Sequence, residues 1–572
     1  MTKKRIPTTK PATKRAPSRI RSLATGVPGF DAILGGGLPE FSFNLIAGSP
    51  GSGKTTLAQQ LIFANATPER PALYFTVLGE PTLKMLRYQQ EFGFYDLAKV
   101  GKSIQYINLS EEALALDLQP VLDRIIHEVE RAKPAIVVVD SFRTLAGRPS
   151  EAGVEGGLSI DQFVQRLALH LTSWEVTSFL LGEYGEGEQR NPVFTVADGV
   201  VWLSQVADRN SVVRKLQAIK VRGRAPMPGL HTFRITNDGV QLFPRIPEQQ
   251  SDRRTPQEGR LTTGVPGLDE LMGGGIPCGD AVMLAGPAGS GKTTFATQFA
   301  AEGLRQGEAV VIVVFEEYPE EYLARASARN HDMENAIESG KLDLIYLRPL
   351  DLSVDETLAE ILQSVQQIGA TRVVIDSLSG FEIALAPSFR DDFRESLYRL
   401  VGALTATGVT ILMTTETVRE GSMGFTTERV SFITDDIIVQ RFVEIDGVLR
   451  KVLAVHKMRG SEHSHDFRLY DIGANGATVG GPLRNYRGIM TGLPQRQRPV
   501  DGPVYPGLTG TEAAVLDTLI RLDGATVVRL AEHVAMLPGE LAATLARFEA
   551  LGYAEMTSRE GPTYQAKAQI GA

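Results

Sequence analysis

The chain has 572 residues, of which 43% are hydrophobic and 22% charged, and this ordinary globular composition predicts two to four domains. Its net charge of −8 argues against general affinity for nucleic acid, although a local basic groove remains compatible with it. No apolar run approaches the ~20 residues of a membrane span, and the basic N-terminus lacks the apolar stretch of a signal peptide. The single cysteine, Cys278, argues against an intrachain disulfide framework and indicates a reducing, cytoplasmic location.

Residues 1–22 are expected to form a disordered basic tail. They contain eight Lys and Arg residues, several prolines and no acidic residue. Such a tail can contact nucleic acid or an acidic partner, but a solvated tail is the favoured interpretation.

A long stretch of the chain then occurs twice. Residues 25–31 (TGVPGFD), followed by three glycines, return as residues 263–269 (TGVPGLD), again followed by three glycines. The offset is 238 residues, and the two segments align without a gap up to the motif described next. A period this long is too large for a solenoid and indicates duplication of a whole domain.

Each copy carries a phosphate-binding loop of the pattern GxxxxGK[ST], at residues 48–55 and 286–293. An apolar run precedes each loop and an amphipathic helix pattern follows it. Backbone N–H groups and the helix N-terminus would hold the phosphates, while Lys54 and Lys292 reach the β- and γ-phosphates. The hydroxyls of Thr55 and Thr293 would bind Mg²⁺. The predicted ATP-binding residues are Ser49, Pro50, Gly51, Ser52, Gly53, Lys54, Thr55, Thr56, Pro287, Ala288, Gly289, Ser290, Gly291, Lys292, Thr293 and Thr294.

Strand and helix patterns alternate within each copy. Strand patterns at 72–77 and 309–315 are followed by helix patterns at 82–92 and 320–330, and buried β-branched runs then end in Asp140 and Asp376. Such runs suit the middle of a parallel sheet. Because open α/β sheets bind ligands at the carboxyl ends of their strands, each aspartate is predicted to hold Mg²⁺ through a water molecule.

Further strand patterns lie at 179–181, 199–203 and 215–220, with counterparts at 410–414, 436–440 and 451–456. The last pattern of each copy runs into a basic turn, with Lys220 and Arg222 in the first copy and Lys457 and Arg459 in the second. The predicted organisation is a first domain at 23–245, a linker at 246–260, a second domain at 261–484 and a second linker at 485–506.

The remaining residues, 507–572, form a separate unit. Three helix patterns and a two-stranded hairpin pattern predict a small winged helix-turn-helix domain. Residues 501–572 hold nine acidic against five basic residues, and the expected recognition helix has only Arg547 as a base. Since DNA binding needs several cations, a docking or assembly module is favoured over a DNA-binding one.

The two copies resemble a known family, the circadian-clock ATPase KaiC, a group of RecA-like P-loop ATPases. The resemblance rests on the TGVPGxD start, the phosphate loop, the Phe-Glu-Glu at 315–317, the strand ending in Asp376, the turn at 457–461 and the segment 430–435. It covers about residues 24–490 and does not include the acidic C-terminal unit.

The resemblance implies an α/β protein with tandem RecA-like domains, mostly parallel central sheets and an ATP-dependent, double-ring homohexamer. ATP and Mg²⁺ would lie between neighbouring subunits. The first ring would hydrolyse ATP slowly, and the second would act as a Ser/Thr autokinase and autophosphatase. A timing or signalling role follows, with KaiB-like or other signalling proteins as partners and without nucleic-acid or membrane partners.

The resemblance also implies roles for single residues. Glu316 or Glu317 would be the general base, with Glu80 in the first domain. Lys220, Arg222, Lys457 and Arg459 would reach the γ-phosphate of a neighbouring subunit, and His463 would contact its nucleotide. A ring explains why the same basic turn occurs in both copies, whereas a solvated surface turn does not. Ser431 would be the phosphoacceptor.

Two positions depart from the family pattern. Gly79 replaces one member of the first domain's acidic pair, so slow or absent turnover is expected there. Phe432 stands where the family has a phosphorylatable threonine, so an ordered two-site phosphorylation cycle is not expected.

Two other functions fit the same motifs. The first is a RecA-like DNA-dependent recombination ATPase, since one fold serves both families, but the acidic net charge and the Ser431 segment count against it. The second is a nucleotide-gated scaffold with little catalysis, in which ATP controls docking through the C-terminal unit.

Overall fold

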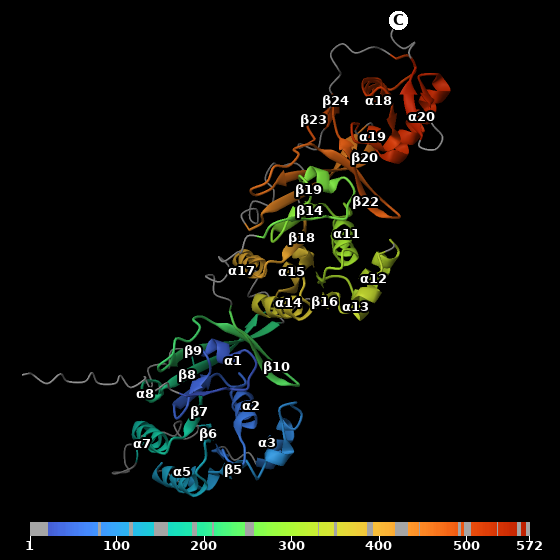
Figure 1. Ribbon diagram of the computed structural model, residues 1–572. Coiled ribbons are helices and arrows are strands. Elements are labelled where there is room, and N and C mark those ends of the chain that lie inside the picture. The colour runs from blue at the N-terminus through green and yellow to red at the C-terminus, as the bar shows by residue number, and fades with distance from the viewer. Residues whose placement is uncertain are drawn as a thin grey trace, which may run out of the picture. The chain divides into compact units, whose positions relative to one another are not determined.

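The computed structural model (Figure 1) describes most of the chain. The described residues are 21–77, 82–113, 118–141, 158, 160–185, 192–208, 211–245, 257–329, 331–347, 352–385, 393–417, 433–445, 447–484, 486–489, 494–496, 505–534, 536–557 and 562–567. Two compact units part between Arg245 and Ile246. In this described part, no helix is long and apolar enough to cross a membrane.

The first unit is built on a nine-stranded sheet with the order β11-β10-β9-β8-β3-β7-β6-β4-β5. The six strands from β8 to β5 are parallel, and β9, β10 and β11 continue the sheet as an antiparallel extension. The strand bounds are β3 (Phe43–Gly48), β4 (Ala72–Thr76), β5 (Ile104–Asn108), β6 (Ile136–Asp140), β7 (Thr177–Glu183), β8 (Gly199–Asp208), β9 (Ser211–Val221), β10 (His231–Thr236) and β11 (Gly239–Phe243), with a separate pair β1 (Ser22–Leu23) and β2 (Leu38–Pro39).

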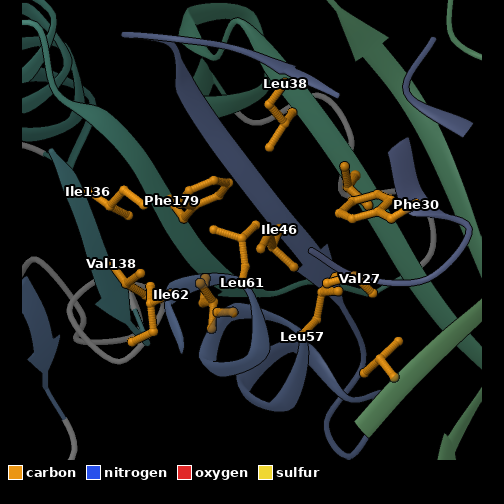
Figure 2. Packing of buried hydrophobic residues seen from close by; sticks show 14 of the residues in the cluster. Val27, Phe30, Leu38, Ile46, Leu57, Leu61, Ile62, Ile136, Val138 and Phe179 are labelled. Carbon is orange, nitrogen blue, oxygen red and sulfur yellow. The ribbon is translucent and has the colours of Figure 1, made fainter. Parts of the chain in front are cut away.

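Helices cover both faces of this sheet, because alternate strand residues point to opposite sides. In β4, Tyr74 packs with α2, while Leu73 and Phe75 pack with α5 and α7. Figure 2 shows α2 on the first face, with Leu57, Leu61 and Ile62 directed at apolar side chains of the strands. The helices are α1 (Phe30–Ile33), α2 (Lys54–Asn65), α3 (Thr82–Gln89), α4 (Ser110–Ala113), α5 (Gln119–Ala132), α7 (Ile160–Ser173) and α8 (Pro192–Val196), with a 3-10 turn η1 (Leu97–Lys99).

The second unit repeats this architecture. Its nine-stranded sheet has the order β16-β15-β17-β18-β14-β19-β20-β21-β22, parallel from β16 to β19 and antiparallel beyond. The strands are β14 (Ala281–Gly286), β15 (Val310–Val314), β16 (Leu342–Tyr346), β17 (Arg372–Asp376), β18 (Thr410–Glu416), β19 (Asp436–Ile445), β20 (Val448–Lys457), β21 (Arg468–Gly473) and β22 (Gly476–Pro482), with short pairs β12 (Arg260–Leu261) with β13 (Ile276–Pro277) and β23 (Tyr486–Arg487) with β24 (Gln495–Arg496). The helices are α10 (Leu268–Leu271), α11 (Lys292–Arg305), α12 (Pro319–Ser327), α13 (Glu334–Glu338), α14 (Val354–Ile368), α15 (Leu378–Ala384) and α17 (Phe393–Ala406).

The C-terminal residues form a small helical part of the second unit with its own core. Thr509 and Glu512 form a capping box at the start of its first helix. The last helix ends at Leu551, and Gly552 follows with φ 78, a left-handed conformation that favours glycine after a helix. The elements are α18 (Gly510–Arg521), β25 (Ala525–Thr526), α19 (Val527–Ala531), α20 (Pro538–Leu551), β26 (Ala554–Met556) and β27 (Thr563–Ala566), with the strand order β25-β27-β26.

Candidate functional site

Each phosphate-binding loop lies between a central strand and a helix, β3 and α2 in the first copy, β14 and α11 in the second. The last loop glycines, Gly53 (φ 99) and Gly291 (φ 100), adopt a left-handed conformation, and no side chain caps the helix that follows. A Cβ there would lie 2.7 Å from Ile235 Cδ1 and 2.1 Å from Ile472 Cδ1. The left-handed backbone conformation therefore favours glycine at both positions, and the loops leave helix N–H groups available to an anion.

The loop lysines point back into their own loops. Lys54 Nζ donates to the carbonyls of Gly48 (3.1 Å) and Ser49 (2.8 Å), and Lys292 Nζ donates to those of Gly286 and Pro287 (both 2.9 Å). Burial lowers the pKa of both ammonium groups, and nearby carboxylates oppose this shift. Each loop thus holds a partly buried cation next to the position that phosphate oxygens would occupy.

The predicted magnesium aspartates lie beside these loops but are held differently. Asp140 Oδ2 accepts from Thr55 Oγ1 (2.8 Å) and Tyr74 OH (2.6 Å), and burial raises its pKa. Asp376 instead accepts from Thr414 of the adjacent strand. Threonine and aspartate oxygens are ligands that suit Mg²⁺. In the described ranges no three His, Cys, Asp or Glu side chains could hold a metal ion, so Mg²⁺ would also need phosphate or water oxygens.

The two glutamates at 316 and 317 have separate environments. Glu316 Oε1 accepts from Ser377 Oγ (3.2 Å). The negative charge of Glu316 also opposes the lowering of the Lys292 pKa. Glu317 pairs with Arg325 of α12, and burial raises its pKa while Arg325 opposes the rise. Glu316 is therefore an electrostatic neighbour of the loop lysine, whereas Glu317 is held in an ion pair with Arg325, a distinction that the sequence left open.

A second pair of carboxylates was missed by the sequence reasoning. Glu183 ends β7 in register with Gly48, and Glu416 ends β18 in register with Gly286. They are the strongest electrostatic neighbours of Lys54 and Lys292. The signal was present, because in each copy an apolar strand neighbouring the loop strand ends in glutamate.

The basic turns lie at the opposite end of the loop strand in each sheet, where that strand begins. Asp198 precedes β8, and its side chain accepts from the N–H of Phe43, the first residue of β3 (3.1 Å). Arg222 binds that same aspartate (2.7 Å). In the second copy, Asp435 accepts from the N–H of Ala281, the first residue of β14 (3.0 Å), and pairs with Arg459 (3.6 Å). Both arginines therefore lie where the loop strand begins, whereas the loop follows the end of that strand.

The other residues predicted to act across the subunit boundary are two lysines of the same basic turns and a histidine that follows the second turn. Lys220 Nζ donates to the carbonyl of Thr195 (3.2 Å), and Lys457 Nζ donates to that of Thr434 (2.6 Å). The ring of His463 packs edge-on against His465, with 4.6 Å between centroids.

The repeated architecture has a counterpart among known protein families. The family model described as "ATPase: KaiC" matches residues 23–246 and again 261–484. The chain belongs to the KaiC family. Its two copies are tandem RecA-like α/β domains with mostly parallel sheets, and family membership implies use of ATP.

Curated KaiC relatives cover both domains. The circadian clock oscillator protein KaiC of Rippkaea orientalis is 30% identical over 495 residues, which are 85% of this chain and 93% of the relative. KaiC 1 of a Synechocystis species is 30% identical over 83% of this chain and 92% of the relative. KaiC of Prochlorococcus marinus is 28% identical over 84% and 96%.

Two residues predicted from the KaiC resemblance lie outside the described residues. They are Glu80, the remaining acidic residue of the first domain, and Ser431, the phosphoacceptor. The departures at Gly79 and Phe432 lie outside them as well.

Proposed function

We propose that this KaiC-family ATPase binds Mg-ATP at both phosphate loops and completes each site with cations from a neighbouring chain, in a double ring of six subunits. The supporting observation is the placement of the loop and the basic turn at opposite ends of one strand. Strand β3 has six residues and spans roughly 17 Å at about 3.3 Å per residue. An arginine side chain does not bridge that length, so Arg222 has no path to its own loop.

A second copy removes this difficulty. If the basic turn of one subunit faces the loop of the next, each chain supplies a loop to one site and a cation to another, and a closed ring satisfies every site. Arginine suits this role because its planar fork binds phosphate oxygens while its charge persists at any relevant pH. Such trans-acting cations contribute about 10³–10⁵ in rate in other phosphoryl-transfer enzymes.

In the second domain the residues divide the chemistry between them. Lys292 and the loop N–H groups bind the β- and γ-phosphates, and Thr293 and Asp376 would hold Mg²⁺ with phosphate and water oxygens. Glu316 orients the attacking hydroxyl and takes its proton, while ADP leaves with the electrons of the broken P–O bond. With water this releases phosphate, and with the hydroxyl of Ser431 it forms phosphoserine.

A timing role is supported by the names of the relatives, which are circadian clock proteins. A slow ATPase with a phosphoacceptor at Ser431 fits a timing or signalling ATPase, with KaiB-like or other signalling proteins as partners. The C-terminal helical part would serve as a winged-helix docking module.

The test measures the size of the protein with and without Mg-ATP. The intact mass then reports any bound phosphate, and an ATPase assay gives the turnover. ATP-dependent hexamers and a phosphate adduct that Ser431→Ala abolishes are expected. Glu316→Gln should lower second-domain turnover and the adduct about 10²-fold or more, and the matched control Glu317→Gln should change both much less. A monomer at saturating ATP would remove the composite site, and an equal adduct in Ser431→Ala would remove the kinase assignment.

A further inference from the structure

One aspartate in each domain links the basic turn to the strand that carries the phosphate loop. In the first domain, Asp198 Oδ2 accepts from Phe43 N at the start of β3, and Asp198 Oδ1 accepts from Arg222 NH1. The backbone N–H of Arg222 also donates to the carbonyl of Asp198 (2.8 Å). A single residue thus fixes both the backbone and the guanidinium of the arginine at the end of the loop strand.

The second domain repeats this connection. Asp435 Oδ2 accepts from Ala281 N, and Asp435 Oδ1 pairs with Arg459 NH1. Asp435 also donates its backbone N–H to the carbonyl of Ala281 (2.9 Å). In both copies the aspartate is the residue just before the next parallel strand, β8 or β19.

We propose that Asp198 and Asp435 are positioning residues that orient Arg222 and Arg459 toward the phosphate of a neighbouring subunit. This inference rests on the proposed composite site. The two aspartates touch no substrate of their own chain, because they lie at the amino end of the loop strand.

The physical reason lies in the geometry of the guanidinium group. It has five N–H donors, and the aspartate engages one terminal nitrogen, which leaves donors on the other side free for an anion. The side chains of Arg222 and Arg459 are 68% and 72% exposed, and the pair with the aspartate is the side-chain contact that the described residues show for each of them. Fixing such a flexible side chain beforehand removes an entropic barrier that would otherwise accompany each turnover.

The connection is tighter in the first domain. The Arg222–Asp198 distance is 2.7 Å, a charge-assisted hydrogen bond, whereas the Arg459–Asp435 distance of 3.6 Å is only an ion pair. Removing the aspartate charge should therefore lower kcat more in the first domain than in the second, when each loss is expressed as a fraction of the loss that the arginine variant of that domain causes.

The experiment compares Asp198→Asn and Asp435→Asn with Arg222→Ala and Arg459→Ala in the full-length protein. Asparagine keeps an oxygen that accepts from Phe43 or Ala281 but no longer attracts the guanidinium. In a domain where the arginine variant lowers kcat, we expect the asparagine variant to lower kcat on the order of 10-fold with KM for ATP unchanged. Asp123→Asn, on the exposed face of α5, is the matched control and should leave kcat unchanged.

A double variant separates positioning from a general structural effect. If Asp198 acts through Arg222, Asp198→Asn should change nothing further in the Arg222→Ala background. A loss that persists in that background, or an altered KM, overturns the inference, as does an unchanged kcat where the arginine variant loses activity. Arginine variants with full activity would instead overturn the composite site itself. Should Asp198→Asn fail to assemble, Asp435→Asn in the same assay decides.

Discussion

The serine before the last glycine of each phosphate loop is fully buried, but its partners differ between the copies. Ser290 Oγ donates to Gln440 Oε1 (2.8 Å), and its carbonyl accepts from Tyr470 OH (2.7 Å). The equivalent strand positions in the first copy hold Leu203 and Phe233, which offer no hydrogen bond. Within the described residues, the hydroxyl of Ser52 has no partner. Hydrogen bonds therefore brace the second loop, and apolar packing holds the first.

This difference predicts unequal effects of the same substitution. Ser290→Ala should destabilise the nucleotide-free second domain by about 1 kcal/mol, because it leaves Gln440 unpaired in the interior. Ser52→Ala should be neutral or slightly stabilising, because it removes a buried hydroxyl without a partner. Hydrogen exchange of the amides in α2 and α11 measures each domain separately. Equal losses of stability in the two domains would contradict the conclusion that hydrogen bonds of the serine brace only the second loop.

Asp436 is a buried carboxyl group that the first copy lacks. It is fully buried at the start of β19, at the register position that Gly199 holds beside β3. Burial, followed by the neighbouring charges of Asp280 and Asp435, raises its pKa to about 7, against a partial opposing effect of the Arg459 backbone N–H. The folded protein therefore binds this proton more tightly than the unfolded chain does.

The sign of the resulting pH dependence follows. The stability linked to this proton is fully present below the unfolded pKa near 4 and is lost as pH rises toward 7. Asp436→Asn should therefore be more stable than the wild type at pH 8 by up to about 4 kcal/mol, and the gain should shrink at pH 5. Urea denaturation at the two pH values measures this, with the exposed Asp471→Asn as control. A gain of the same size at both pH values would contradict the role of Asp436.

Among single residues, the sequence identified those that a motif defines and missed those that only the fold brings together. Lys54, Thr55 and Asp140 do converge at one edge of the sheet. Glu183 and Glu416 reach the loops only because β7 and β18 lie next to the loop strands, a register that no short motif encodes. The separation of Glu316 from Glu317 depends likewise on Arg325 in α12.

Among the elements, central strands were predictable and edge strands were not. The strands before and after the phosphate loop are mostly apolar, because helices cover both of their faces, and Asn44 and Arg372 are the polar exceptions within them before the terminal aspartates. In contrast, β5 and β16 lie at the sheet edge and mix polar with apolar residues, as in Ile104–Asn108. Their weak pattern left them out of the strands predicted from sequence.

The C-terminal helical part packs against the outer strand β22 of the second sheet. A Cβ at Gly481 would lie 2.2 Å from the carbonyl oxygen of Ala531 and 2.5 Å from that of Val534, so the two backbones meet directly. Arg450 of β20 also pairs with Glu540 of α20. Because this pair is partly exposed, it adds at most about 1 kcal/mol, so the close backbone approach at Gly481 is the contact to test.

Gly481→Ala should therefore release the C-terminal helical part while the nucleotide domain stays folded. The added methyl group meets backbone oxygens, which cannot rotate away as a side chain does. Hydrogen exchange should accelerate in α19 and β22 and stay unchanged in α11. Gly473→Ala, where an added Cβ meets nothing within 4 Å, is the matched control. Unchanged exchange in α19 would show that the contact does not hold this part in place.

For the whole molecule, the proposed ring divides each active site between two chains, and mixed rings test this division. Chains with Lys54→Ala and Lys292→Ala keep their basic turns but lose ATP binding, whereas chains with Arg222→Ala and Arg459→Ala bind ATP but lack the cations. Each alone should be nearly inactive. In rings that contain the two variants in equal numbers, a site works where an ATP-binding chain meets an intact basic turn, so about a quarter of the wild-type turnover per ring should return. Size measurement with tagged chains verifies that the two variants share rings. Mixed rings that stay inactive would mean that Arg222 and Arg459 do not act across the subunit boundary.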